Sequence, residues 1–317
     1  MISRRRAFIC GVRGIKLNKK ESFFLKKYKP WGIILFSRNL KTIKQIQNLT
    51  KSIKKIFYDD KYPILVDEEG GRVSRLNKLI DNSTFSGTFF GNLYKNDFNK
   101  FYLYADVYVK QISYLLNTVG INLNTVPVLD IKRDLTHKVI GDRSYSKNSK
   151  TVSKIGDHFI NLFHKNNIGT VMKHIPGHGC ASLDSHIKMP RVRLNYNELN
   201  KFHFSPFKGN TSKFAMTAHI LYEKIDKKNV ATFSKKIISK IIRKEIGFKG
   251  ILISDDISMK ALKYDLVTNA QKALLAGCNL VLYCSGNYKD TYKLIKSVPF
   301  IDEFTSKKTS EFYKFLR

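Results

Sequence analysis

The sequence predicts an α/β protein, a (β/α)8 barrel formed by residues 1–317 as a single domain, and three observations support this fold class. Eight short apolar runs alternate with segments of helical periodicity. Most of these runs are apolar on both faces, as parallel strands covered by helices are. Polar residues follow most of the runs, at the strand ends where a barrel builds its active site. A doubly wound open sheet is the second choice, because there such residues would scatter along one edge.

The eight runs are the predicted strands, and most of their residues are branched or aromatic. In chain order they cover residues 7–12, 32–36, 63–66, 121–126, 169–172, 213–217, 250–253 and 279–283. Alternation of strands and helices with right-handed crossovers leaves few topologies, and a count of eight strands favours the closed barrel.

Three of the segments between the strands carry a clear helical stripe. In the first, Ser234 is the expected N-cap, isoleucines at 237, 238, 241 and 242 form one face, and Gly247 follows the end of the helix. A second stripe, which includes Ala270 and Ala273, ends at Gly277 directly before a strand. The third stripe, within residues 152–162, precedes the strand at 169–172.

The composition is strongly basic, with 57 Lys and Arg against 25 Asp and Glu and a formal net charge of +32. Such a charge attracts nucleic acids and anionic surfaces without specificity. The basic residues are, however, spread along the whole chain, and no five-residue cationic block or nucleic-acid-binding motif occurs. The charge is therefore interpreted as compositional bias, and no specific nucleic-acid partner is expected.

The cysteines and the apolar runs indicate the cellular compartment. Cys10, Cys180, Cys278 and Cys284 form no CxxC pair and no closely spaced ladder, so neither a disulfide scaffold nor a zinc ribbon is expected. No apolar run approaches the ~18 residues of a membrane span, and the start of the chain does not resemble a signal peptide. A cytoplasmic protein without membrane association is the expectation.

The first segment that could carry chemistry is VDEEGGRVSR at residues 66–75. Its two glycines allow a tight turn and a close approach of the backbone to a ligand. Asp67, at the strand end, could accept hydrogen bonds from vicinal hydroxyls, and Arg75 could reach back as a donor. The alternative is a surface turn with local salt bridges, which is favoured for Glu68 but not for Asp67.

The second segment runs from Lys173 and His174, at the end of the fifth strand, through a loop rich in Pro and Gly to Asp184 and His186. Residues two apart in an extended stretch point the same way, so Asp184 can accept a hydrogen bond from the imidazole of His186. Such a bond fixes the tautomer and stabilises the cation, which makes His186 a candidate general acid/base. His178 is the competing candidate for this role.

A zinc site formed by His174, His178 and His186 is the other interpretation of this segment. The spacing does not match the HExxH pattern of a helical zinc site, and Pro176 and Gly177 interrupt any helix. No metal and no organic cofactor are therefore expected.

Two further segments carry single candidates. An apolar strand delivers Asp255 to the expected rim of the barrel, whereas Asp256 or Ser258 is interpreted as the N-cap of the next helix. Arg143 lies in the segment IGDRSY at 140–145, within a long loop after the fourth strand. A surface turn is the alternative interpretation for Arg143.

Taken together, these segments resemble the family 3 glycoside hydrolases, specifically the cytoplasmic β-N-acetylglucosaminidases of bacterial cell-wall recycling. The matching stretches, in order, are VDEEGGRV, PVLDI, VIGDRS, KHIPGHG, DSH, MTAHI and ISDDISMK, within about residues 31–285. The sequence departs from the family pattern at Glu68, where the family usually has Gln, and at Ile175, where it usually has Phe. Neither departure removes a reacting group.

The resemblance implies a retaining exo-β-N-acetylglucosaminidase that releases terminal N-acetylglucosamine from peptidoglycan-derived muropeptides through a covalent glycosyl-aspartate. It implies Asp255 as the nucleophile and His186, oriented by Asp184, as the acid/base. The residues implied to hold the sugar are Asp67, Arg75, Arg143, Lys173 and His174.

Three alternatives to this function remain at the level of the sequence. A β-glucosidase or a glycoside phosphorylase would share the fold, and a histidine acid/base would repel an anionic acceptor such as phosphate less than a carboxylate would. A basic protein that binds nucleic acid or another anionic surface on an inactive barrel is the alternative of a different class. The sequence does not determine the oligomeric state, and a monomer is expected.

Overall fold

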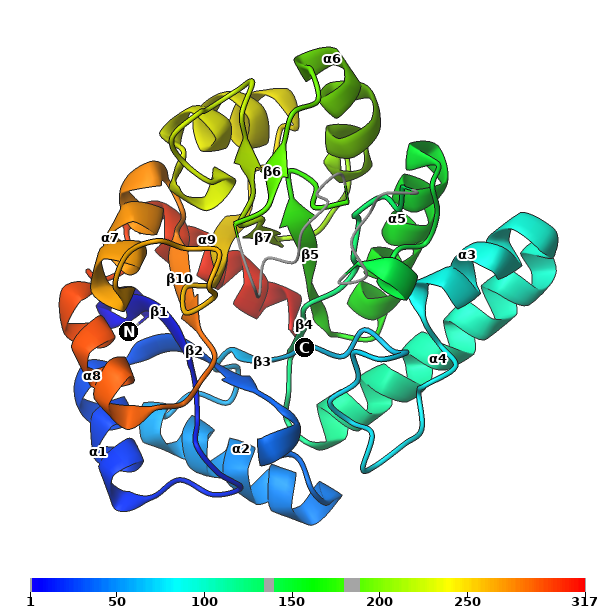
Figure 1. Ribbon diagram of the computed structural model, residues 1–317. Coiled ribbons are helices and arrows are strands. Elements are labelled where there is room, and N and C mark those ends of the chain that lie inside the picture. Colours follow the sequence, from blue (N-terminus) through cyan, green and yellow to red (C-terminus); the bar gives the residue numbers. More distant parts are fainter. Residues whose placement is uncertain (1, 134–139, 180–188, 317) are drawn as a thin grey trace.

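The computed structural model describes residues 2–133, 140–179 and 189–316. Its main sheet is a closed barrel of parallel strands in the order β1-β10-β9-β7-β5-β4-β3-β2 (Figure 1). The strands are β1 (Arg6–Gly11), β2 (Pro30–Leu35), β3 (Ile64–Val66), β4 (Leu123–Asn124), β5 (Gly169–Ile175), β7 (Phe214–Thr217), β9 (Ile251–Asp256) and β10 (Leu280–Tyr283). Each of them overlaps one predicted run, so the predicted (β/α)8 barrel is confirmed.

Helices surround the barrel (Figure 1). They are α1 (Lys19–Tyr28), α2 (Ile43–Phe57), α3 (Gly87–Asn96), α4 (Phe98–Thr118), α5 (Ser149–Lys165), α6 (Tyr196–Glu198), α7 (Leu266–Ala276), α8 (Tyr288–Ser297) and α9 (Glu303–Phe315), with π-helical turns at Leu199–Phe204 and Ile237–Glu245. Short 3-10 turns lie at Ile2–Arg4, Ser37–Asn39, Gly141–Arg143, Ser205–Phe207 and Ala231–Phe233. Strands β6 (Arg191–Val192) and β8 (Leu221–Tyr222) form a separate two-stranded sheet.

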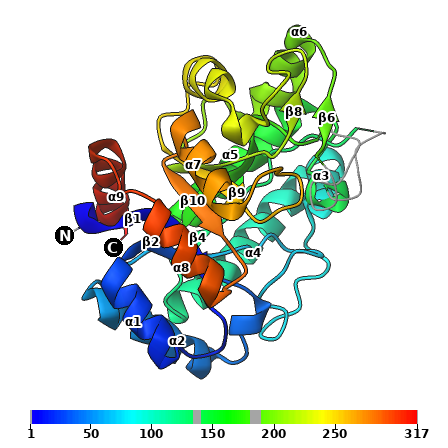
Figure 2. The same cartoon turned by 60° about the vertical axis from the view of Figure 1, so that its left-hand side comes forward.

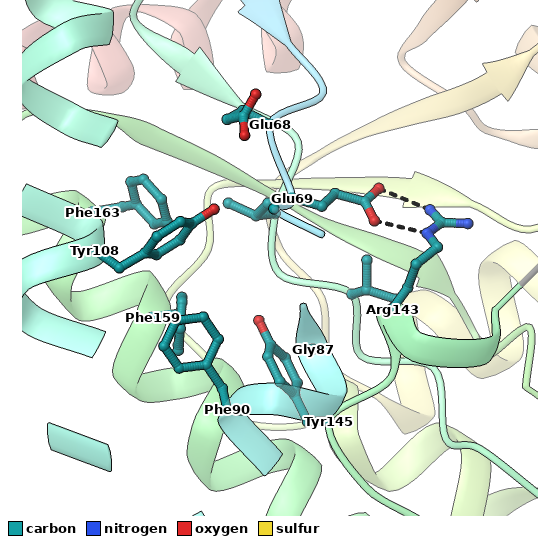
Figure 3. Close-up of a pocket in the computed structure, with 12 residues that line it drawn as sticks. Glu68, Glu69, Gly87, Phe90, Tyr108, Arg143, Tyr145, Phe159 and Phe163 are labelled. Carbon is teal, nitrogen blue, oxygen red and sulfur yellow. Dashed lines mark hydrogen bonds and ion pairs between the residues drawn. The ribbon is translucent and has the colours of Figure 1, made fainter. Parts of the chain in front are cut away.

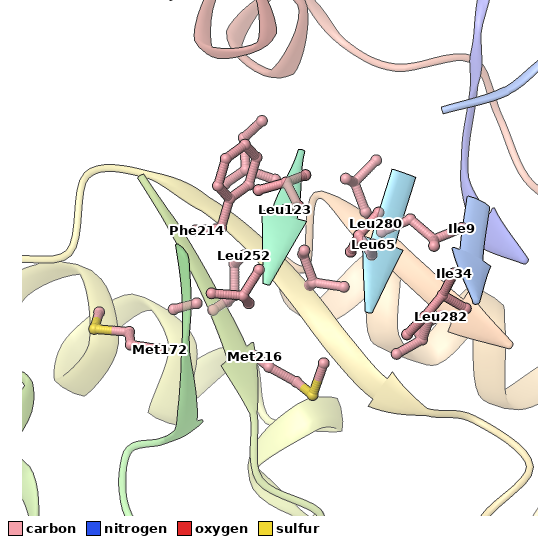
Figure 4. Close-up of a cluster of buried hydrophobic side chains, with 14 of the residues drawn as sticks. Ile9, Ile34, Leu65, Leu123, Met172, Phe214, Met216, Leu252, Leu280 and Leu282 are labelled. Atoms are coloured by element: carbon pink, nitrogen blue, oxygen red, sulfur yellow. The ribbon is translucent and has the colours of Figure 1, made fainter. Parts of the chain in front are cut away.

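The strands are buried on both faces, as their uninterrupted apolar runs predict. Figure 4 shows side chains of the buried cluster, including Ile34, Leu65, Leu123 and Leu252, none of which has any exposed surface. Full burial of a side chain of this kind contributes roughly 1.5–3 kcal/mol to folding. The barrel is therefore held by non-directional packing, which leaves its polar rim available for chemistry.

Helix α9 closes the amino end of the barrel (Figure 2). The indole Nε1 of Trp31, in β2, donates to Thr309 Oγ1 at 2.8 Å, and the Phe312 ring lies 5.1 Å from the ring of Phe214 at the start of β7. Arg5, just before β1, donates to the Tyr313 hydroxyl at 2.7 Å. These contacts fill the amino end of the barrel, and the polar residues that follow the strands lie at the opposite, carboxyl end.

The helix expected after Ser234 is present, but its winding differs. Ser234 Oγ accepts from the backbone N–H of Ile237 at 3.1 Å, and the four isoleucines are buried as predicted. The backbone N–H of Ile246 bonds to Ile241 O, five residues back, so the segment is π-helical. Residues four apart lie on one face in either winding, as Ile237 and Ile241 and Ile238 and Ile242 do, which is why the apolar stripe is preserved.

The N-cap predicted after β9 is wrong. Helix α7 starts at Leu266, and its cap is Asp265, whose Oδ1 accepts from the N–H groups of residues 267 and 268. Asp256 instead accepts from the N–H and hydroxyl of Ser258 at 3.0 and 2.8 Å. This local turn competes with helix formation and delays the helix by several residues.

Glu68 anchors the loop that follows β3, and the interpretation of Glu68 as part of a surface turn is wrong. Its side chain has no exposed surface. Glu68 Oε2 accepts from Ser74 Oγ at 3.0 Å and from the backbone N–H groups of Arg75 and Leu76 at 2.7 and 2.9 Å. Its Oε1 accepts from Asn82 Nδ2 at 3.2 Å. One buried carboxylate thus fixes the path of the loop.

Burial raises the pKa of the Glu68 carboxyl, so the folded protein binds this proton more tightly than the unfolded chain does. The contribution of Glu68 to stability is complete below its unfolded pKa of about 4.3 and is lost as the pH rises through the folded pKa. We expect Glu68→Gln to become progressively more stable relative to wild type between pH 4.5 and 7.5. Urea unfolding at several pH values measures this difference, and a difference independent of pH would contradict the expectation.

Helix α3 lies directly against the backbone of residues 143–145. A Cβ atom on Gly91 would overlap the carbonyl oxygen of Tyr145, and one on Gly87 would overlap that of Arg143. These two glycines allow the close approach that holds Arg143 in place.

We expect Gly91→Ala to destabilise the fold by about 1–3 kcal/mol, because a methyl group is forced into backbone atoms that have no room to move. Thermal unfolding measures the effect. Gly14→Ala is the matched control, since its Cβ would meet nothing closer than 4.0 Å. Equal stability of the two variants would contradict this account of the packing.

Candidate active site

Charged side chains from three neighbouring strands meet at the carboxyl end of the barrel. Asp67 and Glu69 follow β3, Asp130 follows β4, and Lys173 lies near the end of β5. Strands β3, β4 and β5 are consecutive in the barrel. The segment before Asp130 continues along β5, because the N–H of Leu129 donates to Lys173 O at 2.7 Å. The rule that polar residues after strands mark one site therefore holds here.

Asp67 lies among two cations and a hydroxyl. It accepts hydrogen bonds from Thr125 Oγ1 and, at 3.3 Å, from an Nη of Arg75, and Lys173 Nζ lies 3.4 Å from its Oδ1. Burial alone would raise the pKa of Asp67, but the charges of Lys173 and Arg75 outweigh it and hold the pKa well below its usual range. Asp67 is therefore a carboxylate at neutral pH.

Glu69 forms the most complete ion pairs of the site (Figure 3). Its two oxygens accept from Arg143 Nε at 2.7 Å and Nη2 at 2.8 Å, which is the bidentate geometry that fits a guanidinium. Lys173 Nζ lies 2.6 Å from the same Oε1 that Arg143 Nη2 contacts. Burial opposes ionisation, but the charges of Arg143 and Lys173 lower the pKa of Glu69 to about 2.

His174 is oriented by Asp130. Its Nδ1 lies 2.6 Å from Asp130 Oδ2, and Asp130 also accepts from the backbone N–H groups of His174 and His178. Although burial opposes it, the interaction with His174 lowers the pKa of Asp130 to about 2. An ionised carboxylate only accepts hydrogen bonds, so Nδ1 carries the proton and Nε2 is the nitrogen left for a ligand.

Asp255 lies near the end of β9 and is half-buried. Its Oδ1 accepts from the backbone N–H of Asp256 at 2.8 Å. Burial would raise the pKa of Asp255, but His219, His174 and the Asp256 N–H outweigh this effect and lower it. Asp255 is therefore ionised at neutral pH, as a nucleophile must be.

The structure describes only part of the loop after β5, which holds the residues predicted as a general acid/base or as zinc ligands. Asp184 and His186 lie outside the described residues. Burial lowers the pKa of the His178 imidazole to about 4, which makes it a poor proton donor near neutral pH. Within residues 2–133, 140–179 and 189–316, no three His, Cys, Asp or Glu side chains are grouped as metal ligands would be. The zinc interpretation involves His186, so it stays untested.

The sequence analysis assigned no role to three residues that organise this site, namely Glu69, Thr125 and Asp130. Asp130 was recognisable as a polar residue after a strand, but nothing local indicated its bond to His174. Arg143 was expected either in a ligand-binding loop or in a surface turn. Its side chain is only 11% exposed, which excludes the surface turn.

Several comparisons with known proteins agree on one family. The model of the glycosyl hydrolase family 3 N-terminal domain matches residues 6–305. A beta-hexosaminidase of Shewanella frigidimarina is 33% identical over 284 residues, which cover 86% of this chain and 80% of that protein. Beta-hexosaminidase A of Pseudoalteromonas piscicida is 30% identical over 272 residues, and the match spans 80% of this chain but only 45% of that longer protein.

The fold of a solved relative is also the same. NagZ from Neisseria gonorrhoeae, in complex with N-trifluoroacetyl-D-glucosamine, superposes with a TM-score of 0.87 at 27% identity, over 98% of this chain and 90% of that one. No helix in the described part of the chain is long and apolar enough to cross a membrane. The closed parallel barrel, the charged cluster at its carboxyl end and the match over residues 6–305 lead to one conclusion: the chain belongs to glycosyl hydrolase family 3.

Proposed function

We propose that this protein is a retaining exo-β-N-acetylglucosaminidase that releases terminal N-acetylglucosamine from peptidoglycan-derived muropeptides in the cytoplasm. The observation that carries the proposal is an ionised aspartate, Asp255, at the carboxyl end of a family 3 barrel, within electrostatic reach of Lys173 and His174. The beta-hexosaminidase names of the relatives support the choice of an amino sugar. We further propose that residues 1–317 act as one catalytic domain and as a monomer.

Asp255 would act as the nucleophile in the first step. Its carboxylate oxygen forms a bond to the anomeric carbon while the bond from that carbon to the leaving oxygen breaks. The leaving oxygen takes a proton from an acid, for which we propose His186 oriented by Asp184. In the second step the same imidazole accepts a proton from water, and the water oxygen displaces Asp255 from the sugar. The two inversions together retain the configuration.

A histidine acid suits the electrostatics around Asp255. A second carboxylate near Asp255 would make one of the two harder to ionise, whereas a neutral imidazole adds no negative charge. The imidazole becomes neutral when it gives its proton to the leaving group, and it becomes charged again when it activates water.

The cluster between β3 and β5 would hold the sugar. Asp67 would accept hydrogen bonds from sugar hydroxyls, because it is a carboxylate at neutral pH. Arg75, Arg143 and Lys173 would donate to hydroxyls and to the N-acetyl carbonyl, and His174 Nε2 would accept a hydrogen bond from a hydroxyl. Fixing a substrate in this way supplies a large part of the rate enhancement of an enzyme.

We expect Asp255→Ala to reduce the turnover of p-nitrophenyl β-N-acetylglucosaminide about 10³-fold or more, because no nucleophile remains. Asp256→Ala is the matched control, since Asp256 is occupied by the turn at Ser258. In the wild type, a 5-fluoro glycoside should leave a covalent adduct on the peptide that carries Asp255, as measured by mass spectrometry. An adduct on Asp256, or a product of inverted configuration, would refute the assignment.

The same substrate distinguishes hydrolysis from phosphorolysis. We expect the rate of p-nitrophenol release to be unchanged by inorganic phosphate and the product to be free N-acetylglucosamine, as identified by mass spectrometry. Acceleration by phosphate together with a sugar 1-phosphate product would instead identify a phosphorylase. Faster turnover of the corresponding β-glucoside would identify a glucosidase.

A further inference from the structure

We infer that Glu69 is a positioning residue that holds Arg143 and Lys173 in the geometry in which they bind the sugar. The inference rests on the proposed function and deepens it, because it concerns a residue expected to touch no substrate itself. It explains how Lys173, in strand β5, and Arg143, in the segment before α5, lie at one site.

The contacts of Glu69 leave each cation with a defined orientation. Arg143 uses Nε and Nη2 on Glu69, and Figure 3 shows its third nitrogen turned away from the carboxylate. Lys173 Nζ contacts Glu69 at 2.6 Å, Thr125 Oγ1 at 2.8 Å and Asp67 at 3.4 Å. The contact of Lys173 with Asp67 is the longest of the three. We therefore expect an incoming sugar hydroxyl to accept a hydrogen bond from the Lys173 ammonium group on the side of Asp67.

Burial makes this arrangement depend on the charge of Glu69. The side chains of Lys173, Glu69 and Arg143 are 3%, 5% and 11% exposed, so water screens them little. Lys173 and Arg143 contact the same oxygen of Glu69, and without its charge they would repel each other at short range. Asp67 contacts Lys173 but makes no ion pair with Arg143 among the described contacts, so it does not replace Glu69.

Aromatic side chains line the side of Glu69 that faces away from Arg143 (Figure 3). Figure 3 shows aromatic side chains on the side of Glu69 opposite Arg143, among them Phe90, Phe159 and Phe163. The Tyr108 hydroxyl in this group is buried and has no hydrogen-bond partner among the described residues. This lining offers Glu69 aromatic rings and hydroxyls, whereas both cations that it contacts lie elsewhere, at Arg143 and Lys173.

Glu68 is the natural control because it is an adjacent, buried carboxylate with a different environment. Within the described part of the chain, neutral groups donate the hydrogen bonds to Glu68, namely a hydroxyl, an amide and two backbone N–H groups. A glutamine at position 68 can keep the three hydrogen bonds to Oε2 through its carbonyl oxygen and loses only the one from Asn82 to Oε1, whereas at position 69 it removes a charge that two cations share.

The test measures kcat and KM of Glu69→Gln, Glu68→Gln and wild type with p-nitrophenyl β-N-acetylglucosaminide. Thermal unfolding gives the Tm of all three proteins. We expect Glu69→Gln to lose about 10²-fold in kcat/KM, mainly through a higher KM, because displacement of binding groups by about 1 Å costs this much. Glu68→Gln should change KM less than about threefold. A purely structural defect would lower Tm and the amount of active enzyme but would leave KM unchanged.

A folded Glu69→Gln enzyme with a KM within about threefold of wild type would overturn the inference, and so would an equal rise of KM in Glu68→Gln. If Glu69→Gln does not fold, Glu69→Asp replaces it as the test variant, because the shorter side chain keeps the charge but cannot hold Arg143 and Lys173 in the same places, and it should also raise KM. The wild type separates the two proposals. Absence of wild-type turnover refutes the proposed function, whereas turnover with an unchanged KM in the variant refutes only the role of Glu69.

Discussion

Charges buried at the carboxyl end of the barrel have to be paired, and this constraint organises the whole site. A charge removed from water costs several kcal/mol unless a partner and hydrogen bonds compensate. Asp67 is compensated by Arg75 and Lys173, and Asp130 by His174 and backbone N–H groups. The groups that would bind sugar are thus fixed by one another before any ligand arrives, which lowers the cost of ordering them on binding.

The order of the strands places the proposed sugar-binding cluster and the proposed nucleophile on two parts of the rim. Strands β3, β4 and β5 are consecutive and carry the cluster that would hold the sugar, whereas Asp255 lies on β9, separated from β5 by β7. His219, between them after β7, bonds through Nε2 to the backbone oxygen of Asp256 at 3.0 Å. The closed barrel sets the distance between this charged cluster and Asp255, because no strand can shift without disturbing its neighbours.

The parts of this structure that the sequence predicted depend on local pattern. Apolar runs and the polar residues after them are local features, and they were enough to identify the barrel and to bring Asp67, Lys173 and His174 to one end. The pairing of Glu69 with Arg143 joins residues 74 positions apart, and no periodicity indicates it. The N-cap at Asp265 was missed for a related reason. Asp256 and Ser258 can cap a helix equally well from their sequence, and only the structure shows that they bond to each other in a turn instead.

Runs of consecutive acids at the strand ends have a common explanation in the geometry of an extended chain. Side chains of successive residues in a strand point to opposite sides, and residues two apart point to the same side. Asp67 and Glu69 accordingly share contacts with Lys173, while Glu68 between them anchors the loop from a fully buried position. At the end of β9, Asp256 fixes the following turn, and Asp255 is the carboxylate for which we propose a catalytic role. In both runs, therefore, one acid anchors the local backbone and a neighbouring acid on the other side of the chain belongs to the proposed site.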